Sequence, residues 1–155
     1  MSLPKLSVVI PTFNEEKHLP NLLKYLGEQT VQPHEIIIGD NSSDRTPEIA
    51  KAAGCKVTPG PTVGAGRNNP GKIATGDVLL FLDCDVRFGK NFIEKSLKEF
   101  VEKKLTVAMV QFGYDSLHPF DVAFGWIMNY GNMLLQYVYP FTHGFSIMST
   151  KEVFD

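Results

Sequence analysis

Apolar and polar residues alternate along the chain in blocks that predict strands and helices in turn. Leu6 to Ile10 is a continuous apolar run ended by Pro11, which is typical of a strand that is buried on both faces. We expect Asn14 to cap a helix after this strand, with acidic residues in its first turn and an end near Gly27. Its apolar face is marked by leucines at helical spacing, namely Leu19, Leu22, Leu23 and Leu26.

The same alternation continues towards the C-terminus. Strands are predicted at residues 35–39, 55–58, 77–82, 106–112 and 145–148, and helices at 46–54 and 91–103, with Thr150 as the cap of a last helix. The glycine-rich segment from Val63 to Gly76 is expected to hold a short helix or turn around Arg67. This order favours an α/β fold with one mostly parallel open sheet and helices on both faces. Without a repeat or a linker, residues 1–155 are expected to form a single domain.

One long segment raises the question of a membrane. Between Asp121 and Lys151 the chain has no Asp, Glu, Lys or Arg, although polar residues interrupt the run. Gly125, Asn129, Asn132 and Gln136 share one helix face, and Ile127, Tyr130, Leu134 and Tyr137 share another. The pattern predicts an amphipathic helix from Phe120 to Val138 that does not span a bilayer. It either packs on the sheet, which we favour, or makes peripheral contact with a membrane surface.

Composition excludes several classes of protein. A hydrophobic fraction of 43% and a charged fraction of 21% are typical of a globular domain, and the net charge of −2 gives no basic face for a nucleic acid polymer. Cys55 and Cys84 are too few for a disulfide framework or a zinc site, which favours reduced thiols in a cytoplasmic protein. Residues 1–5 lack the charged and apolar regions of a signal peptide.

Polar side chains gather where the predicted strands end. In an open parallel sheet, ligands bind outside the carboxyl ends of the strands, so these side chains are expected to converge on one site. They follow the first strand, the second strand and the apolar strand at 77–82, and they are Thr12, Asn14, Asp40, Asn41, Asp44, Asp83 and Asp85.

Asp83 and Asp85 carry the sharpest chemical signal. Two carboxylates at one strand end repel each other unless a cation lies between them. Mg²⁺ and Mn²⁺ take oxygen ligands, often one or two carboxylates together with substrate phosphates. Such an ion would neutralise the charge that develops on a departing diphosphate. The alternative is an acidic turn beside Arg87, in which Asp83 caps a loop.

Three other side chains have a functional and a structural interpretation. The carboxylate of Asp40 can accept a hydrogen bond from a base imide, or it can form an Asx turn or a cap, as can Asp44. Arg67 lies among glycines that allow a close approach to a base carbonyl or a phosphate, or it forms a surface salt bridge. His143 can line a sugar site or serve a turn.

Taken in order, several segments resemble the family 2 glycosyltransferases, which have the Rossmann-like GT-A fold. These segments are SVVIPTFNEE (Ser7 to Glu16), IIIGDNSSDRT (Ile36 to Thr46), GRN (Gly66 to Asn68) with ATGD (Ala74 to Asp77), and FLDCD (Phe81 to Asp85). The tail from His143 to Asp155 is similar to the segment before the family's acceptor-side motif. The resemblance covers almost the whole chain. It implies a nucleoside-diphosphate sugar donor, with uridine as the nucleoside, and an unknown saccharide or lipid-linked acceptor.

The resemblance also implies roles for individual residues. Thr12, Asp40 and Arg67 would contact the base, Asp83 would lie near the ribose and the metal, and Asp85 would ligate Mg²⁺ or Mn²⁺. The remaining residues of the expected nucleotide-sugar site are Pro11, Asn14, Glu15 and Asn41. Members usually invert the anomeric centre, with an Asp or Glu base that deprotonates the acceptor hydroxyl.

The chain departs from the family pattern in three places. Gly39 stands where many members carry a first acid, which is expected to loosen base recognition, and Pro70 stands where a glycine is common. The family's catalytic base is expected beyond Asp155, so no residue is nominated for that role.

The alternatives to a glycosyltransferase are a non-catalytic nucleotide-sugar-binding module and a nucleotidyltransferase. The second is disfavoured because the segment after the first strand has no basic glycine-rich loop. Oligomerisation, and peripheral contact at the inner face of the membrane, stay open.

Overall fold

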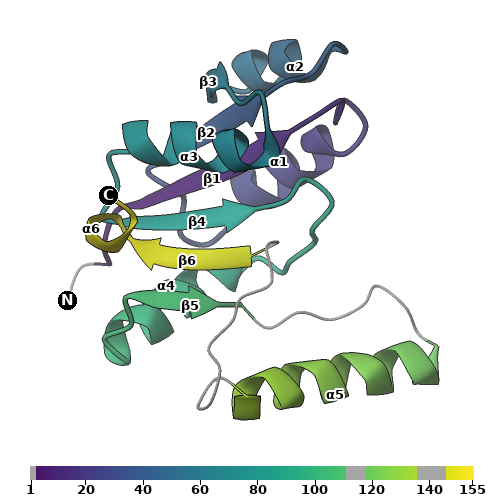
Figure 1. Ribbon diagram of the computed structural model, residues 1–155, viewed down its shortest axis with the longest axis vertical. Helices are drawn as coiled ribbons and strands as arrows, with labels where there is room; N and C mark the ends of the chain where they lie inside the picture. The colour runs from purple at the N-terminus through teal and green to yellow at the C-terminus, as the bar shows by residue number, and fades with distance from the viewer. Residues whose placement is uncertain (1–2, 111–117, 136–145) are drawn as a thin grey trace.

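A computed structural model of the protein describes residues 3–110, 118–135 and 146–155, so His143 and the end of the expected helix at 120–138 lie outside the described residues. In the described part, six strands form one sheet in the order β3-β2-β1-β4-β6-β5 (Figure 1). The strands are β1 (Leu6–Thr12), β2 (Glu35–Asp40), β3 (Lys56–Pro59), β4 (Val78–Leu82), β5 (Val107–Met109) and β6 (Ser146–Thr150).

The expected mostly parallel sheet is confirmed. β1 pairs in parallel with β2 and β4, and β2 pairs in parallel with β3. β6 runs antiparallel to both β4 and β5, so the sheet is mixed at this edge. Because β6 starts opposite Leu82 and ends opposite Val78, the helix that follows it lies at the amino end of β4.

Helices cover both faces of the sheet, as expected (Figure 1). One face carries α1 (Leu19–Gly27), α2 (Thr46–Ala52) and α4 (Phe92–Glu102), and the other carries α3 (Val63–Ile73) and α6 (Lys151–Phe154). Successive side chains of a strand point to opposite faces, so Val8 and Ile10 join the first core and Val9 joins the second. Burial on both faces explains why β1 and β4 read as continuous apolar runs.

Near the strand ends, one local expectation is wrong and another is resolved. Asn14 does not cap a helix, because α1 begins at Leu19 and Asn14 has a left-handed backbone with φ of 57°. Asparagine tolerates this conformation, and the Asn14 Oδ1 accepts a hydrogen bond from the backbone N–H of Ser43 at 2.9 Å. The segment around Arg67, expected as a short helix or turn, is a helix of 11 residues. It is capped by the Thr62 hydroxyl, which accepts from the backbone N–H of Ala65 at 3.1 Å.

The helix α5 (Pro119–Leu135) stands apart from the sheet on the side of β5 (Figure 1). Within the described ranges it makes no extensive contact with another helix or strand, so the docking on the sheet that we favoured is not observed. The sequence pattern shows that one face is apolar, but not which face turns towards the protein. None of the helices among the described residues is both long enough and apolar enough to cross a membrane.

Candidate functional site

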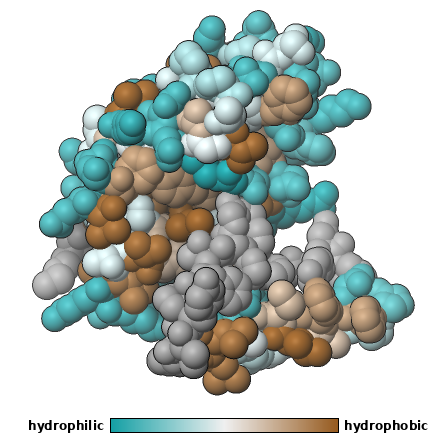
Figure 2. Space-filling view, in the orientation of Figure 1, coloured by the Kyte–Doolittle hydropathy of each residue, from teal (hydrophilic) through white to brown (hydrophobic). Residues whose placement is uncertain are grey.

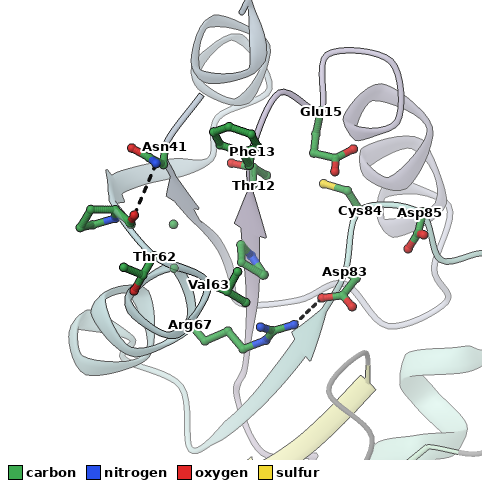
Figure 3. Close-up of a pocket in the computed structure, with 15 residues that line it drawn as sticks. Thr12, Phe13, Glu15, Asn41, Thr62, Val63, Arg67, Asp83, Cys84 and Asp85 are labelled. Carbon is green, nitrogen blue, oxygen red and sulfur yellow. Dashed lines mark hydrogen bonds and ion pairs between the residues drawn. The ribbon is translucent and has the colours of Figure 1, made fainter. Parts of the chain in front are cut away.

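A pocket lies at the carboxyl ends of β1, β2 and β4, where the sequence predicted a ligand site (Figure 3). Its volume of about 450 Å³ falls within the range of small-molecule sites. The described residues that line it come from the ends of these three strands, from the segment after β3 and from the first turns of α3. They are Pro11, Thr12, Phe13, Glu15, Gly39, Asn41, Gly60, Pro61, Thr62, Val63, Gly66, Arg67, Asp83, Cys84 and Asp85.

The structure brings most of the predicted site residues to this pocket. Seven of the nine line it, namely Pro11, Thr12, Glu15, Asn41, Arg67, Asp83 and Asp85. The other two, Asn14 and Asp40, do not line it. Asn14 is turned towards the loop after β2, where it bonds to Ser43.

Asp40 is held by neighbours beside the pocket. Its Oδ1 accepts hydrogen bonds from the hydroxyls of Thr12 at 2.6 Å and Ser42 at 2.7 Å, and its Oδ2 accepts from the backbone N–H of Ser42 at 3.2 Å. The last of these is the Asx-type turn that the sequence allowed as an alternative. Asp44 likewise serves a local role, because its carboxylate accepts from the backbone N–H groups of Thr46 and Glu16. Asp40 therefore orients Thr12, which does line the pocket.

Arg67 and Asp83 form an ion pair across the floor of the pocket (Figure 3). The Arg67 Nη2 donates to the Asp83 Oδ1 at 2.6 Å, joining α3 to the end of β4. The side chains of Arg67 and Asp83 are 23% and 34% exposed, so the ion pair is partly buried rather than fully exposed at the surface. Burial raises the pKa of Asp83, Arg67 opposes that change and the nearby Asp85 adds to it, with a net rise.

Negative charge is concentrated around the turn at Cys84. Burial raises the pKa of the Cys84 thiol far above its usual range, and Glu15, Asp83 and Asp85 raise it further. The thiol therefore stays protonated, so it lines the pocket and does not act as a nucleophile. The same field attracts a cation to the mouth of the pocket.

The residues present fit a divalent ion that shares its ligands with a phosphate. Within residues 3–110, 118–135 and 146–155, no group of three or more His, Cys, Asp or Glu side chains gathers to enclose a metal. Asp83 and Asp85 alone supply carboxylate oxygens at the strand end. Mg²⁺ is usually held in this way, by one or two carboxylates plus substrate phosphates and water.

Three glycines set how closely α3 approaches the sheet. A Cβ atom at Gly39 would lie 2.1 Å from the carbonyl oxygen of Gly66, and one at Gly60 would lie 2.7 Å from the Gly66 Cα. Such distances are impossible, so backbone meets backbone here. Pro70 contributes to this arrangement, because it has no N–H to donate to the Gly66 carbonyl, which lies against Gly39 instead. Gly39 thus has a packing role that the sequence did not reveal.

Sequence reasoning missed several residues that line the pocket. Phe13 is 65% exposed at its rim, and a large exposed aromatic directly after a strand could have marked it. Thr62 and Val63 lie at the start of α3 and line the pocket. They could be placed there only once the helix was known to begin at Val63. Gly60 also lines the pocket, and its close approach to α3 depends on the assembled fold.

An open sheet with a polar pocket at the carboxyl ends of its parallel strands is the arrangement in which α/β domains of this class bind their ligands. Residues 7–154 match Glycosyl transferase family 2, and the chain belongs to this family. The resemblance inferred from the four motifs is therefore confirmed.

Several known proteins are similar to this chain. A 4,4'-diaponeurosporenoate glycosyltransferase of Staphylococcus haemolyticus is 34% identical over 129 residues, which cover 77% of this chain and 33% of the relative. The structure of S. aureus TarS 1-349 in complex with UDP-GlcNAc is 28% identical, with a TM-score of 0.62 over 72% of this chain and 36% of that one. The mannosyltransferase PcManGT from Pyrobaculum calidifontis, in complex with GDP-Man and Mn²⁺, is 18% identical, with a TM-score of 0.74 over 99% of this chain and 46% of that one. The chain thus spans about a third of the first relative's length.

Proposed function

We propose that the pocket binds a nucleoside-diphosphate sugar and that the protein transfers the sugar to an acceptor hydroxyl with inversion at the anomeric carbon. One observation carries the proposal: Asp83, Asp85 and Arg67 meet at the carboxyl end of β4 inside a pocket of suitable size. Membership of the glycosyltransferase family and the UDP-GlcNAc complex of TarS support it. The acceptor is a saccharide or a lipid-linked hydroxyl compound of unknown identity.

Each side chain has a defined part in the proposal. Asp85, with Asp83, ligates Mg²⁺ or Mn²⁺, and the ion when bound offsets the negative charge of the diphosphate. Arg67 holds Asp83 in place and contacts the donor. Thr12 reads the base, which we take to be uracil, and Asp40 acts there through its hydrogen bond to Thr12. Pro11, Glu15 and Asn41 complete the walls.

The described residues offer no suitable general base. Glu15, which lines the pocket, is hydrogen-bonded to the Nδ1 of His18 at 2.8 Å. The carboxylates of Glu152 and Asp155 belong to α6, which follows β6 at the amino end of β4, whereas Asp83 follows the carboxyl end. Asp155 is also paired with Lys151. We therefore assign no catalytic base within this chain.

Calorimetric titration with UDP-sugars, in Mn²⁺ and again in EDTA, tests the metal and donor assignments together. We expect binding to require the ion and Asp85→Asn to lose most of the effect of the metal. Glu102→Gln, a change in an exposed carboxylate of α4, is the matched control and should leave binding unaltered. Equal affinity with and without the ion would remove the metal from the proposal, and equal affinity for UDP and ADP would contradict the choice of uracil.

A further inference from the structure

The helix α5 has its polar and apolar faces arranged in the opposite way to a helix that packs on a protein core. Asp121, Gly125, Asn129 and Asn132 recur at spacings of four, four and three residues, and they share one face. This face is the covered one, because Gly125 and Asn132 are buried and the other two are half-buried. The large apolar side chains point the other way, so the helix presents its apolar side outwards.

The outward side chains form what we call the apolar arc of α5. They are all at least 41% exposed, and they are Phe120, Val122, Phe124, Trp126, Ile127, Tyr130, Met133, Leu134 and Leu135. Figure 2 shows the side chains of this helix as a brown and tan strip at the lower edge of the molecule. A soluble protein rarely exposes so many large apolar groups side by side, so a partner for this surface is required.

The width of the apolar arc decides what kind of partner fits. At about 100° per residue, the nine positions span roughly 220° of the helix circumference, from Val122 round to Leu135. A helix that packs on a protein buries a stripe about 100° wide, so one partner helix or one sheet face would leave half of the arc in water. A fluid apolar medium can cover the whole arc.

The chemistry of the apolar arc points to the same medium. It contains no side chain that is charged at neutral pH, since the single charged residue of α5 is Asp121 on the covered face. Trp126 and Tyr130 stack with ring centroids 5.4 Å apart, and these two residue types favour the boundary between lipid and water. The 17 residues of α5 are about 25 Å long, which is less than the roughly 30 Å of bilayer hydrocarbon.

We propose that α5 is a lipid-binding element that lies flat in the surface of a bilayer with its apolar arc inserted and its polar face towards the protein. Because α5 carries no Lys or Arg, insertion is driven by the apolar side chains and does not depend on anionic lipid. This inference does not rest on the proposed function, since it uses no residue of the pocket.

Flotation with vesicles and the fluorescence of Trp126, the single tryptophan of the chain, test the proposal. With vesicles of pure phosphatidylcholine, we expect the protein to float, the emission to shift to the blue and brominated acyl chains to quench it. Vesicles that also contain phosphatidylglycerol should bind equally well, in low and in high salt. Alkaline carbonate should release the protein, since α5 does not span the bilayer.

A triple variant tests which residues insert. Phe120→Ser, Ile127→Ser and Leu134→Ser alter the most exposed line of the apolar arc and keep Trp126 as the reporter. We expect the partitioning of the protein into vesicles to fall by at least about tenfold, since each substitution removes a large apolar side chain that the bilayer would otherwise bury. The matched control combines Ile73→Ser, Val101→Ser and Val153→Ser, three exposed apolar residues outside α5, and should partition like the unmodified chain.

Four outcomes would overturn the inference. One is binding that requires anionic lipid, and another is protein that carbonate cannot extract. A third is an unmodified chain whose Trp126 is not quenched by brominated lipid. The fourth is a chain that forms a dimer in sedimentation and in which the same triple variant restores the monomer, because the arc would then be a contact between protein chains. The quenching measurement uses the unmodified protein, so the inference stays testable even if the variant does not fold.

Discussion

Arg67 is the residue on which the charge balance of the pocket depends. Its hydrogen bond to Asp83 links α3 to the acidic turn after β4. We expect Arg67→Ala to weaken the binding of a UDP-sugar by about 10- to 100-fold, because a hydrogen bond to a charged group contributes about 1.5–3 kcal/mol. Lys72→Ala, on an exposed position of the same helix, is the control and should bind normally. Unaltered affinity in Arg67→Ala, measured by calorimetry, would exclude Arg67 from the donor site.

Glu35 governs stability at the opposite end of the strands. Burial raises the pKa of Glu35, but hydrogen bonds from Lys56, Ser7 and Thr75 outweigh burial and hold it at about 2. Because folding lowers this pKa, the ionised carboxylate of Glu35 stabilises the fold. The stabilisation is complete above pH 4.5, the ordinary pKa, and disappears as the pH falls towards about 2. We expect Glu35→Gln to reduce the free energy of unfolding at pH 7 by about 1–3 kcal/mol, because it removes the carboxylate that accepts hydrogen bonds from Lys56, Thr75 and the buried Ser7.

Urea denaturation at pH 7, 4 and 3 measures this effect of Glu35. The difference in unfolding free energy between the unmodified chain and Glu35→Gln should shrink as the pH falls. A difference that stays constant over this range would show that the ionised carboxylate does not stabilise the fold. Glu102→Gln, in an exposed position, should have a small effect at every pH.

Single residues also show where prediction from sequence reaches its limit. Asp83 and Asp85 were identifiable because an acidic pair directly after a buried strand has few structural reasons to exist. Asp40 was harder, because a carboxylate in a turn can face either a ligand or its own backbone, and here it bonds to Thr12 and Ser42. The Glu35 network joins β1, β2, β3 and the turn before β4, so it exists only once these strands are assembled.

At the scale of elements, α3 lies close to β2 because Gly39 and Gly66 have no side chains between the two backbones. Gly39→Ala would put a Cβ atom within 2.1 Å of the Gly66 carbonyl oxygen, so α3 must move away from β2. We expect this variant to lose about 1–3 kcal/mol of unfolding free energy, as overpacked cores do, and to bind donor more weakly because Arg67 moves with α3. Thermal unfolding and calorimetry measure the two effects.

Gly64→Ala is the matched control for Gly39→Ala, because Gly64 belongs to α3 and a Cβ atom there would meet no atom closer than the Thr62 Oγ1 at 4.0 Å. Alanine is a better helix former than glycine, so this variant should be as stable as the unmodified chain or more so. If both alanine variants behave alike, close backbone packing does not position α3. The sequence could not predict this contact, since it depends on the spacing between two elements rather than on either alone.

At the scale of the whole molecule, the sheet was predictable and the surroundings of α5 were not. Strands such as β4 are buried on both faces, so their apolar runs and the helices between them determine a parallel α/β layout. For α5 the spacing of Asn129 and Asn132 identified a polar face. Helical periodicity separates two faces of a helix, but it does not show which of them contacts the protein. We favoured packing of the apolar face, and the structure turns that face outwards.

The last prediction concerns the chain of 155 residues as a catalyst. We expect it to bind a nucleoside-diphosphate sugar but to transfer little or none of it. Inverting transfer needs a base within hydrogen-bond reach of the acceptor hydroxyl, and its loss typically lowers the rate by about 10²–10⁴-fold. In the described part of the chain, Asp83 is paired with Arg67, Glu15 with His18, and the carboxylates of α6 lie at the far end of β4. Slow hydrolysis of the donor can persist, because a metal-bound diphosphate remains a good leaving group.

Radiolabelled donor, incubated with lipid and saccharide acceptors, tests this expectation. Donor binding measured on the same preparation is the control, since it separates a missing base from an inactive pocket. Binding without transfer is the expected result, and it would also fit the alternative of a non-catalytic nucleotide-sugar-binding module for this segment. Strong metal-dependent transfer that is abolished by one substitution outside Asp83 and Asp85 would instead identify a base within the chain. Glu15→Gln is the first variant to examine in that case, because Glu15 is the remaining carboxylate that lines the described pocket.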